Sequence, residues 1–90
     1  VTDREEADKV LLALSETVAA RLRADHVQAE VVSVGIKYYD LSYASHQKAL
    51  GMSTDLTAEI CRAARELFAQ LWDHRPIRHL GVNTGRGRGV

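Results

Sequence analysis

The sequence has 90 residues, twelve acidic against twelve basic side chains, and a composition that is 46% hydrophobic. This length fits one domain with a single core. No apolar run approaches the roughly 18 residues of a membrane-spanning helix, and the polar start is unlike a signal peptide. The one cysteine, Cys61, excludes an internal disulfide and favours a cytoplasmic location. Because the chain begins at Val1 rather than Met, we expect a piece of a longer protein.

Charge is distributed unevenly along the chain. Residues 1–30 carry seven acidic and four basic side chains, and residues 51–74 carry four and two, a combined net charge of −5. Residues 31–50 and 75–90 carry the balancing +5. The acidic segments have helical patterns and the basic segments have strand patterns. We therefore expect a two-faced domain whose sheet side attracts a polyanion, the alternative being that every charge is simply solvated.

The first segment predicts an amphipathic helix from about Asp3 to Ala24. Thr2-Asp-Arg-Glu5 has the spacing of a capping box with Thr2 as the N-cap. Apolar residues then recur at helical steps and form one stripe: Ala7, Val10, Leu11, Leu14, Val18 and Leu22.

Val31–Leu50 predicts an antiparallel β-hairpin. Strict alternation separates an apolar set (Val32, Val34, Ile36, Tyr38) from a second set (Ser33, Gly35, Lys37, Tyr39). A polar turn at residues 40–43 leads to a second extended segment, Ala44–Leu50, which Gly51 and Met52 close. We expect the polar face to carry Ser33, Lys37 and Tyr39, with Lys48 and either His46 or Gln47.

A second helix is predicted after Ser53-Thr54-Asp55, with either hydroxyl as its cap. Its apolar face comprises Leu56, Ile60, Ala63, Ala64, Leu67, Phe68 and Leu71. Cys61 and Trp72 are expected at the margin of that face. Pro76 disfavours helical geometry in the residue before it, so the helix should end near residues 73–74.

The last strand should run from Ile77 to about Thr84. Alternation points Leu80 and Val82 inward and three residues outward: His79, Gly81 and Asn83. Arg78 stays ambiguous, because alternation directs it inward while the strand entrance could free it to reach outward.

The predicted order is α-β-β-α-β, an α+β domain over residues 1–84 with two helices on one face of a mainly antiparallel sheet. The other face, polar and basic, is left open. Residues 85–90, with Arg86 and Arg88, form a glycine-rich tail that should be flexible. This tail fits nucleic-acid binding and a ragged terminus about equally well.

The residues that usually carry catalysis are scattered. None of the four histidines has metal-ligand spacing with Cys61, and no glycine-rich loop opens a helix. Ser45 and His46 are neighbours on a strand, so they point to opposite faces and cannot form a nucleophile–base pair. The sequence therefore predicts a binding module without catalytic residues, metal or cofactor.

Three stretches carry a resemblance to a known family. They are Val18–Arg23 (VAARLR), the pair IKYYDL and ASHQKAL, and Arg75–Val82 (RPIRHLGV), with ELFAQLW before the last strand. In this order the chain, from about Thr2 to Val82, resembles the C-terminal little-finger domain of Y-family (DinB/UmuC, ImpB/MucB/SamB) translesion DNA polymerases. The Gram-positive polymerase-IV-like branch is the most similar.

The resemblance implies a ferredoxin-like β-α-β-β-α-β domain whose sheet grips the phosphates of primer–template duplex DNA in the major groove. The family's first strand is missing here, which should leave an open slot or exposed edges able to pair with another copy. The implied DNA-binding residues are Lys37, Ser45, His46, Gln47, Lys48, Arg78, His79, Asn83 and Arg86. Family members often have basic residues where His79 and Asn83 stand, so a weaker grip, or a dependence on Arg86 and Arg88, is expected.

The resemblance also bears on catalysis and partners. The parent resembles a DNA-directed DNA polymerase, a nucleotidyltransferase whose Mg²⁺-binding carboxylates belong to a palm domain absent from this chain. This fragment is therefore not expected to be catalytic alone. A sliding clamp is a further candidate partner of the parent, but no clamp-binding peptide stands out, since Gln70-Leu-Trp72 is expected to be core.

Two other functions are compatible with this fold. An RNA-binding module could use Tyr39 and Tyr43 to stack on bases, although the aromatic-rich strand signature of that fold is lacking. A ferredoxin-like regulatory or oligomerisation domain with no DNA role would pack its bare sheet on a partner sheet. That role requires an apolar outer face, whereas Lys37, Gln47 and Asn83 are polar.

Overall fold

The computed structural model describes residues 3–85 and confirms the predicted order of elements. These are α1 (Arg4–Ala24), β1 (Ala29–Tyr38), β2 (Tyr43–Thr54), α2 (Thr57–Leu71) and β3 (Ile77–Gly85). Thr2 and the predicted tail residues Arg86 and Arg88 lie outside the described part.

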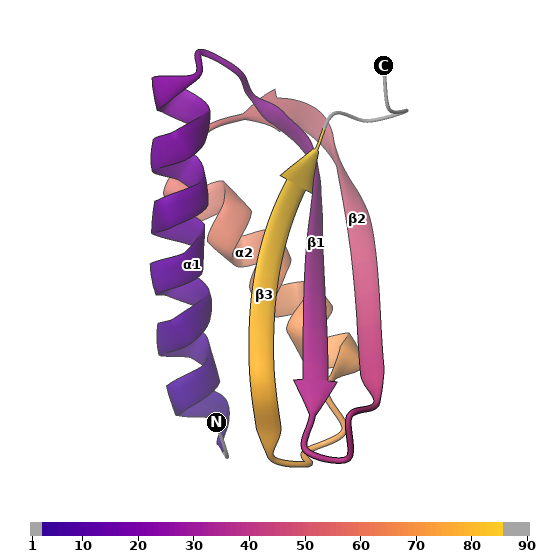
Figure 1. Cartoon of the computed structure of the whole chain (residues 1–90). Helices are drawn as coiled ribbons and strands as arrows, with labels where there is room; N and C mark the ends of the chain where they lie inside the picture. Colours follow the sequence, from indigo (N-terminus) through magenta and orange to yellow (C-terminus); the bar gives the residue numbers. More distant parts are fainter. Residues whose placement is uncertain (1–2, 86–90) are drawn as a thin grey trace.

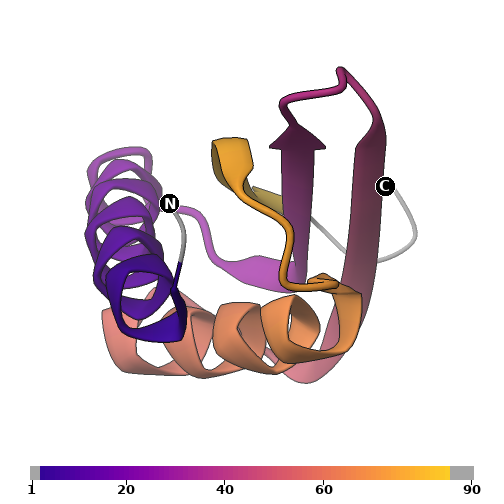
Figure 2. The ribbon, with the colours of Figure 1, turned by 90° about the horizontal axis from the view of Figure 1, so that it is seen from below.

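β1 is the centre of a three-stranded antiparallel sheet with the strand order β2-β1-β3. Helix α2 crosses behind β1 and β2, and α1 packs against α2 and β3, so one sheet face is covered (Figures 1 and 2). The α+β class is confirmed. Both neighbours pair directly with β1, so the described sheet has no internal slot. Its unpaired edges are the outer sides of β2 and β3.

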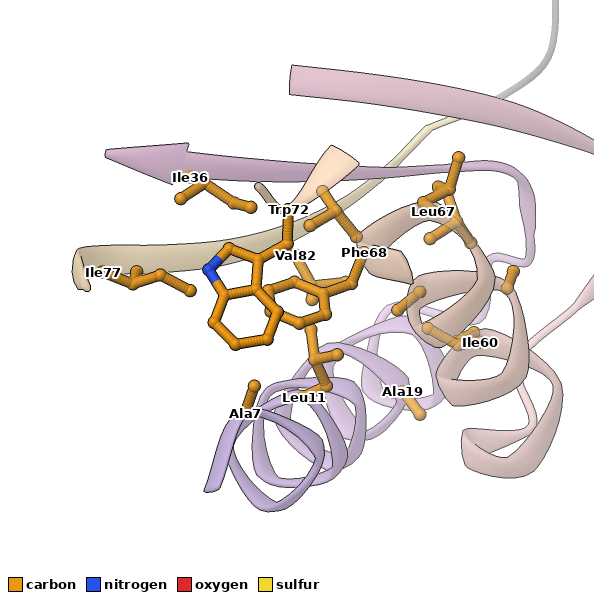
Figure 3. Packing of buried hydrophobic residues seen from close by; sticks show 14 of the residues in the cluster. Ala7, Leu11, Ala19, Ile36, Ile60, Leu67, Phe68, Trp72, Ile77 and Val82 are labelled. Atoms are coloured by element: carbon orange, nitrogen blue, oxygen red, sulfur yellow. The ribbon is translucent and has the colours of Figure 1, made fainter. Parts of the chain in front are cut away.

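The covered face holds the core. Val32, Val34, Ile36 and Tyr38 of β1 are buried there, as their alternation predicts. Phe68 and Trp72 stack at the centre of the cluster with ring centroids 5.1 Å apart (Figure 3). Trp72 and Cys61, which we expected at the margin of the second helix, are both buried. The indole Nε1 of Trp72 donates to the backbone oxygen of Arg75 at 2.9 Å, so this buried N–H has its partner.

The residue that caps the first helix differs from the predicted one. The Asp3 carboxylate accepts from the Glu6 backbone N–H at 2.7 Å and caps α1. The prediction named Thr2, one residue earlier.

The connection between β2 and α2 also differs from the prediction. Ser53 and Thr54 belong to β2, which continues through Gly51 and Met52 instead of closing there. A shift of register between Ala29 and Val31 absorbs the extra residues. Helix α2 then begins at Thr57 without a side-chain cap and ends at Leu71, earlier than predicted.

Leu14 and Leu67 are both expected in the core from the sequence, but replacing them with alanine should lower stability by different amounts. Leu67 of α2 is 2% exposed, whereas Leu14 of α1 only packs against the core from its edge. We expect Leu67→Ala to lower the free energy of unfolding by roughly 2–5 kcal/mol through the cavity it leaves. Leu14→Ala should cost clearly less. Urea unfolding of both variants checks this order, and equal losses would contradict the burial difference.

One buried hydroxyl offers a stabilising change. Ser15 of α1 is fully buried, and its Oγ has no hydrogen-bond partner within residues 3–85. Ser15→Ala removes the desolvation cost of this hydroxyl and improves helix propensity, so we expect a gain of about 1 kcal/mol in unfolding free energy. Thermal unfolding should show a higher midpoint, and a lower one would mean that the hydroxyl is satisfied in solution.

Candidate nucleic-acid interface

The sheet face turned away from the helices is the candidate interface. Directly opposed residues of an antiparallel pair point to the same side, so the register with β1 assigns every side chain to a face. The open face consists of four rows across β2, β1 and β3. They are the lysine row (Tyr43, Lys37, His79), the glycine row (Ser45, Gly35, Gly81), the amide row (Gln47, Ser33, Asn83) and a last row (Ala49, Val31, Gly85).

These rows differ sharply in size and polarity. The glycine row has little side-chain volume of its own and forms a low floor between the lysine row and the amide row. The Tyr43 ring covers this floor at Gly35, and the floor is open at Gly81, where a Cβ atom would meet nothing within 4 Å. Hydrogen-bond donors border the floor on both sides, from Lys37 on one and from Gln47 and Asn83 on the other. None of the twelve paired positions is acidic. Such a surface suits an extended anionic chain that approaches the backbone closely.

Six of the nine predicted DNA-binding residues belong to or border this face. Five lie in the rows: Lys37, Ser45, Gln47, His79 and Asn83. Arg78 lies beside them. Since Tyr38 opposes Ile77 and Lys37 opposes His79, Arg78 is the extra residue of a β-bulge and is exposed. The bulge explains why alternation left the direction of Arg78 ambiguous. With one extra residue at this point, β3 buries Ile77 and still brings His79 to the open face.

The prediction that Lys48 shares this face is wrong, and of the two alternatives His46 and Gln47 only Gln47 lies on it. His46 opposes Val34 and Lys48 opposes Val32, both core residues of β1, so the two side chains are on the helix side. The Lys48 ammonium pairs with the Glu66 carboxylate of α2. This hydrogen bond holds the pKa of Glu66 below its usual value. Arg86, the ninth residue, lies outside the described part.

Arg75 joins the hairpin turn to the connection before β3. Its guanidinium lies 4.0 Å from the centre of the Tyr38 ring, and it donates to Asp73 at 2.6 Å and to Asp40 at 3.1 Å. We call Tyr38, Asp40, Asp73 and Arg75 the arginine clasp. It fixes the end of the hairpin next to the lysine row, a role that the sequence did not indicate.

Several groups of the clasp have shifted pKa values. Hydrogen bonds from the Ser42 hydroxyl and amide hold the pKa of Asp40 below its usual value, and Arg75 adds to this effect. Desolvation opposes the shift of Asp73, but hydrogen bonds from the Arg75 amide and guanidinium still lower its pKa. Burial raises the pKa of the Tyr38 phenol.

The clasp changes the charge balance that the sequence indicated. Of the cations assigned to the sheet side, Lys48 and Arg75 are paired with carboxylates. Lys37 and Arg78 are those without an ion pair among residues 3–85. The open face is therefore basic, but less strongly than the count by segments suggested.

The helix side has a hollow of about 590 Å³ between α1 and α2. Arg4, Leu12, Arg62 and Arg65 contribute to its lining, together with the carboxylate-bearing Glu66. Arg65 lies 3.9 Å from Asp8 across the two helices. Asp8 and Glu66 therefore place two carboxylates beside the three arginines of this hollow, and one of them, Glu66, is already paired with Lys48.

Among residues 3–85, no group of three histidine, cysteine or carboxylate side chains is placed to hold a metal ion. Neither helix is long and apolar enough to cross a membrane.

The clasp should make stability depend on acid pH. The pKa values of Asp40 and Asp73 are lowered in the folded state, so their contribution is fully present above the ordinary carboxyl value of 3.8. It is lost as the pH falls through the lowered values. We expect Arg75→Leu to unfold at a lower temperature than the unmodified chain between pH 5 and 7, and the difference to shrink below about pH 3.8. Calorimetry across this range checks it, and a gap that stays constant into acid would exclude the ion pairs as its source.

Comparison with known proteins agrees with this architecture. The model of the impB/mucB/samB family C-terminal domain matches residues 1–86. DNA polymerase IV 2 of Bacillus subtilis is 39% identical over 93% of the chain, and DNA polymerase IV of Clostridium acetobutylicum is 37% identical over 91%. DNA polymerase IV of Acetivibrio thermocellus is 32% identical over 93%. The chain spans about a fifth of the length of these relatives, 22%, 21% and 21% respectively. The chain belongs to the impB/mucB/samB C-terminal domain family.

Proposed function

We propose that this chain is the non-catalytic little-finger domain of an error-prone translesion DNA polymerase. Its open sheet face would hold duplex phosphates of primer–template DNA in the major groove during lesion bypass in DNA repair. The observation that carries the proposal is the lysine row, in which Lys37 stands between Tyr43 and His79 in a set of twelve paired positions that contains no acidic residue. The parent would be a cytoplasmic nucleotidyltransferase with its Mg²⁺ site in another domain.

The composition of the rows favours backbone contacts over base reading. At Gly81, where no side chain covers the floor, a phosphodiester strand can come close to the main chain. Hydroxyl and amide groups of Ser33, Ser45, Gln47 and Asn83 can donate to phosphate oxygens, a kind of contact that positions a protein without selecting a sequence. A polymerase that must follow any template needs such indifference to sequence.

The two alternative functions fit the open face less well. A sheet that packs on a partner sheet needs an apolar surface, whereas the lysine and amide rows are polar. The RNA-binding alternative depends on Tyr39 and Tyr43 stacking on unpaired bases. Of these two side chains only Tyr43 belongs to the four rows, so the open face offers one of the two stacking surfaces.

A matched pair of lysine variants tests the proposal. Lys37 lies on the open face, and Lys48 lies on the helix side beside Glu66. We expect Lys37→Ala to weaken duplex binding and to lower the slope of log affinity against log salt by about 0.9, the value for one neutralised phosphate. Lys48→Ala should leave both unchanged. Fluorescence anisotropy with a labelled DNA duplex, repeated over a range of salt concentrations, measures the affinity and the slope.

Thermal unfolding of both variants shows whether each remains folded. Equal losses of binding in the two variants, or no loss in either, would show that the open face is not the DNA-binding site. Tighter binding of a single-stranded RNA than of the DNA duplex would favour the RNA alternative.

A further inference from the structure

The side chain of Tyr43 lies over the glycine row. Tyr43 stands opposite Lys37 at the β2 edge of the sheet, yet its ring reaches diagonally to Gly35. A Cβ atom at Gly35 would lie 3.0 Å from Cζ and 3.3 Å from Cε2 of Tyr43, and closer still to the hydroxyl oxygen. The hydroxyl end of the ring therefore rests above Gly35. Only glycine at this position leaves room for it.

The neighbouring part of the same floor is unoccupied by side chains. Gly81 opposes Gly35 on β3, and a Cβ atom there would have no atom within 4 Å. Tyr43 is 66% exposed, so the ring packs on the floor while much of it faces solvent. Its hydroxyl lies next to an open floor that Lys37 and His79 border along the adjoining row.

We propose that the Tyr43 hydroxyl, Lys37 and His79 form a subsite for one backbone phosphate of DNA above Gly81, and that Gly35 sets the position of Tyr43. This inference rests on the proposed function. A phenol O–H donates a strong hydrogen bond to an anionic oxygen, and an ammonium group supplies a point charge beside it. The bare glycine floor gives the phosphate access to both. Tyr43 is therefore a phosphate-binding residue and Gly35 its positioning residue, whereas the sequence pattern suggested Tyr43 only for stacking on RNA bases.

Three variants test the subsite by duplex anisotropy. Tyr43→Phe removes the hydroxyl and keeps the ring, and we expect duplex affinity to fall about 3- to 10-fold, as for the loss of one ordinary solvent-exposed hydrogen bond. The salt slope should stay the same, because no charge is removed. Gly35→Ala should push the ring away and cause a similar loss. Tyr39→Phe is the control, since Tyr39 is equally exposed on the same hairpin but lies outside the rows.

The double variant Gly35→Ala/Tyr43→Phe identifies the mechanism. If Gly35 acts by placing the Tyr43 hydroxyl, the double variant binds no more weakly than either single variant. Fully additive losses would overturn the role of Gly35. Should Gly35→Ala not fold, Tyr43→Phe against Tyr39→Phe still decides whether the hydroxyl binds phosphate.

The Lys37→Ala variant separates this inference from the proposed function. Normal binding by Tyr43→Phe together with weak binding by Lys37→Ala would overturn the subsite alone. Normal binding by both would overturn the proposed function as well.

Discussion

The pairing of β1 with a strand on each side is the constraint on which the rest of the structure depends. Because opposed residues share a face, the alternation of β1 fixes the faces of both neighbours. Val32 and Val34 face the core, and this places Lys48 and His46 with the helices. Ser33 and Lys37 face outward, and this gathers Gln47, Asn83 and His79 around them. One strand thus determines both the core and the candidate interface.

Two local features at the end of β1 keep the lysine row in place. The bulge at Arg78 lets β3 bury Ile77 and still present His79 beside Lys37. The arginine clasp ties the turn after Tyr38 to the segment before β3, so both neighbours of β1 are anchored where the row begins. A displaced turn would move Tyr43, the first residue of β2.

Local periodicity predicted the elements, the faces of β1 and the inward residues of β3, because one apolar side contrasts with one polar side along each segment. It failed for β2. On this edge strand residues 43–53 are exposed or half-buried on both sides, so hydrophobicity contains no signal that separates His46 from Gln47. Only the register with β1 does. The burial of Trp72 and the pairing of Arg75 with Asp40 likewise depend on tertiary contacts that no sequence window contains.

The same distinction explains why charge counted by segment differs from charge counted by face. Lys48 and Arg75 belong to segments with strand patterns, yet both are paired within the fold. Glu66 neutralises the charge of Lys48, and Asp40 and Asp73 neutralise that of Arg75. Lys37 remains as the cation of the rows, supported by neutral donors and by Arg78 beside them. A face of this kind suits the proposed role, a contact with phosphates that does not select a sequence. In the proposed parent polymerase, duplex DNA would have to advance past this domain after each nucleotide, and contacts that do not read the bases would allow that movement.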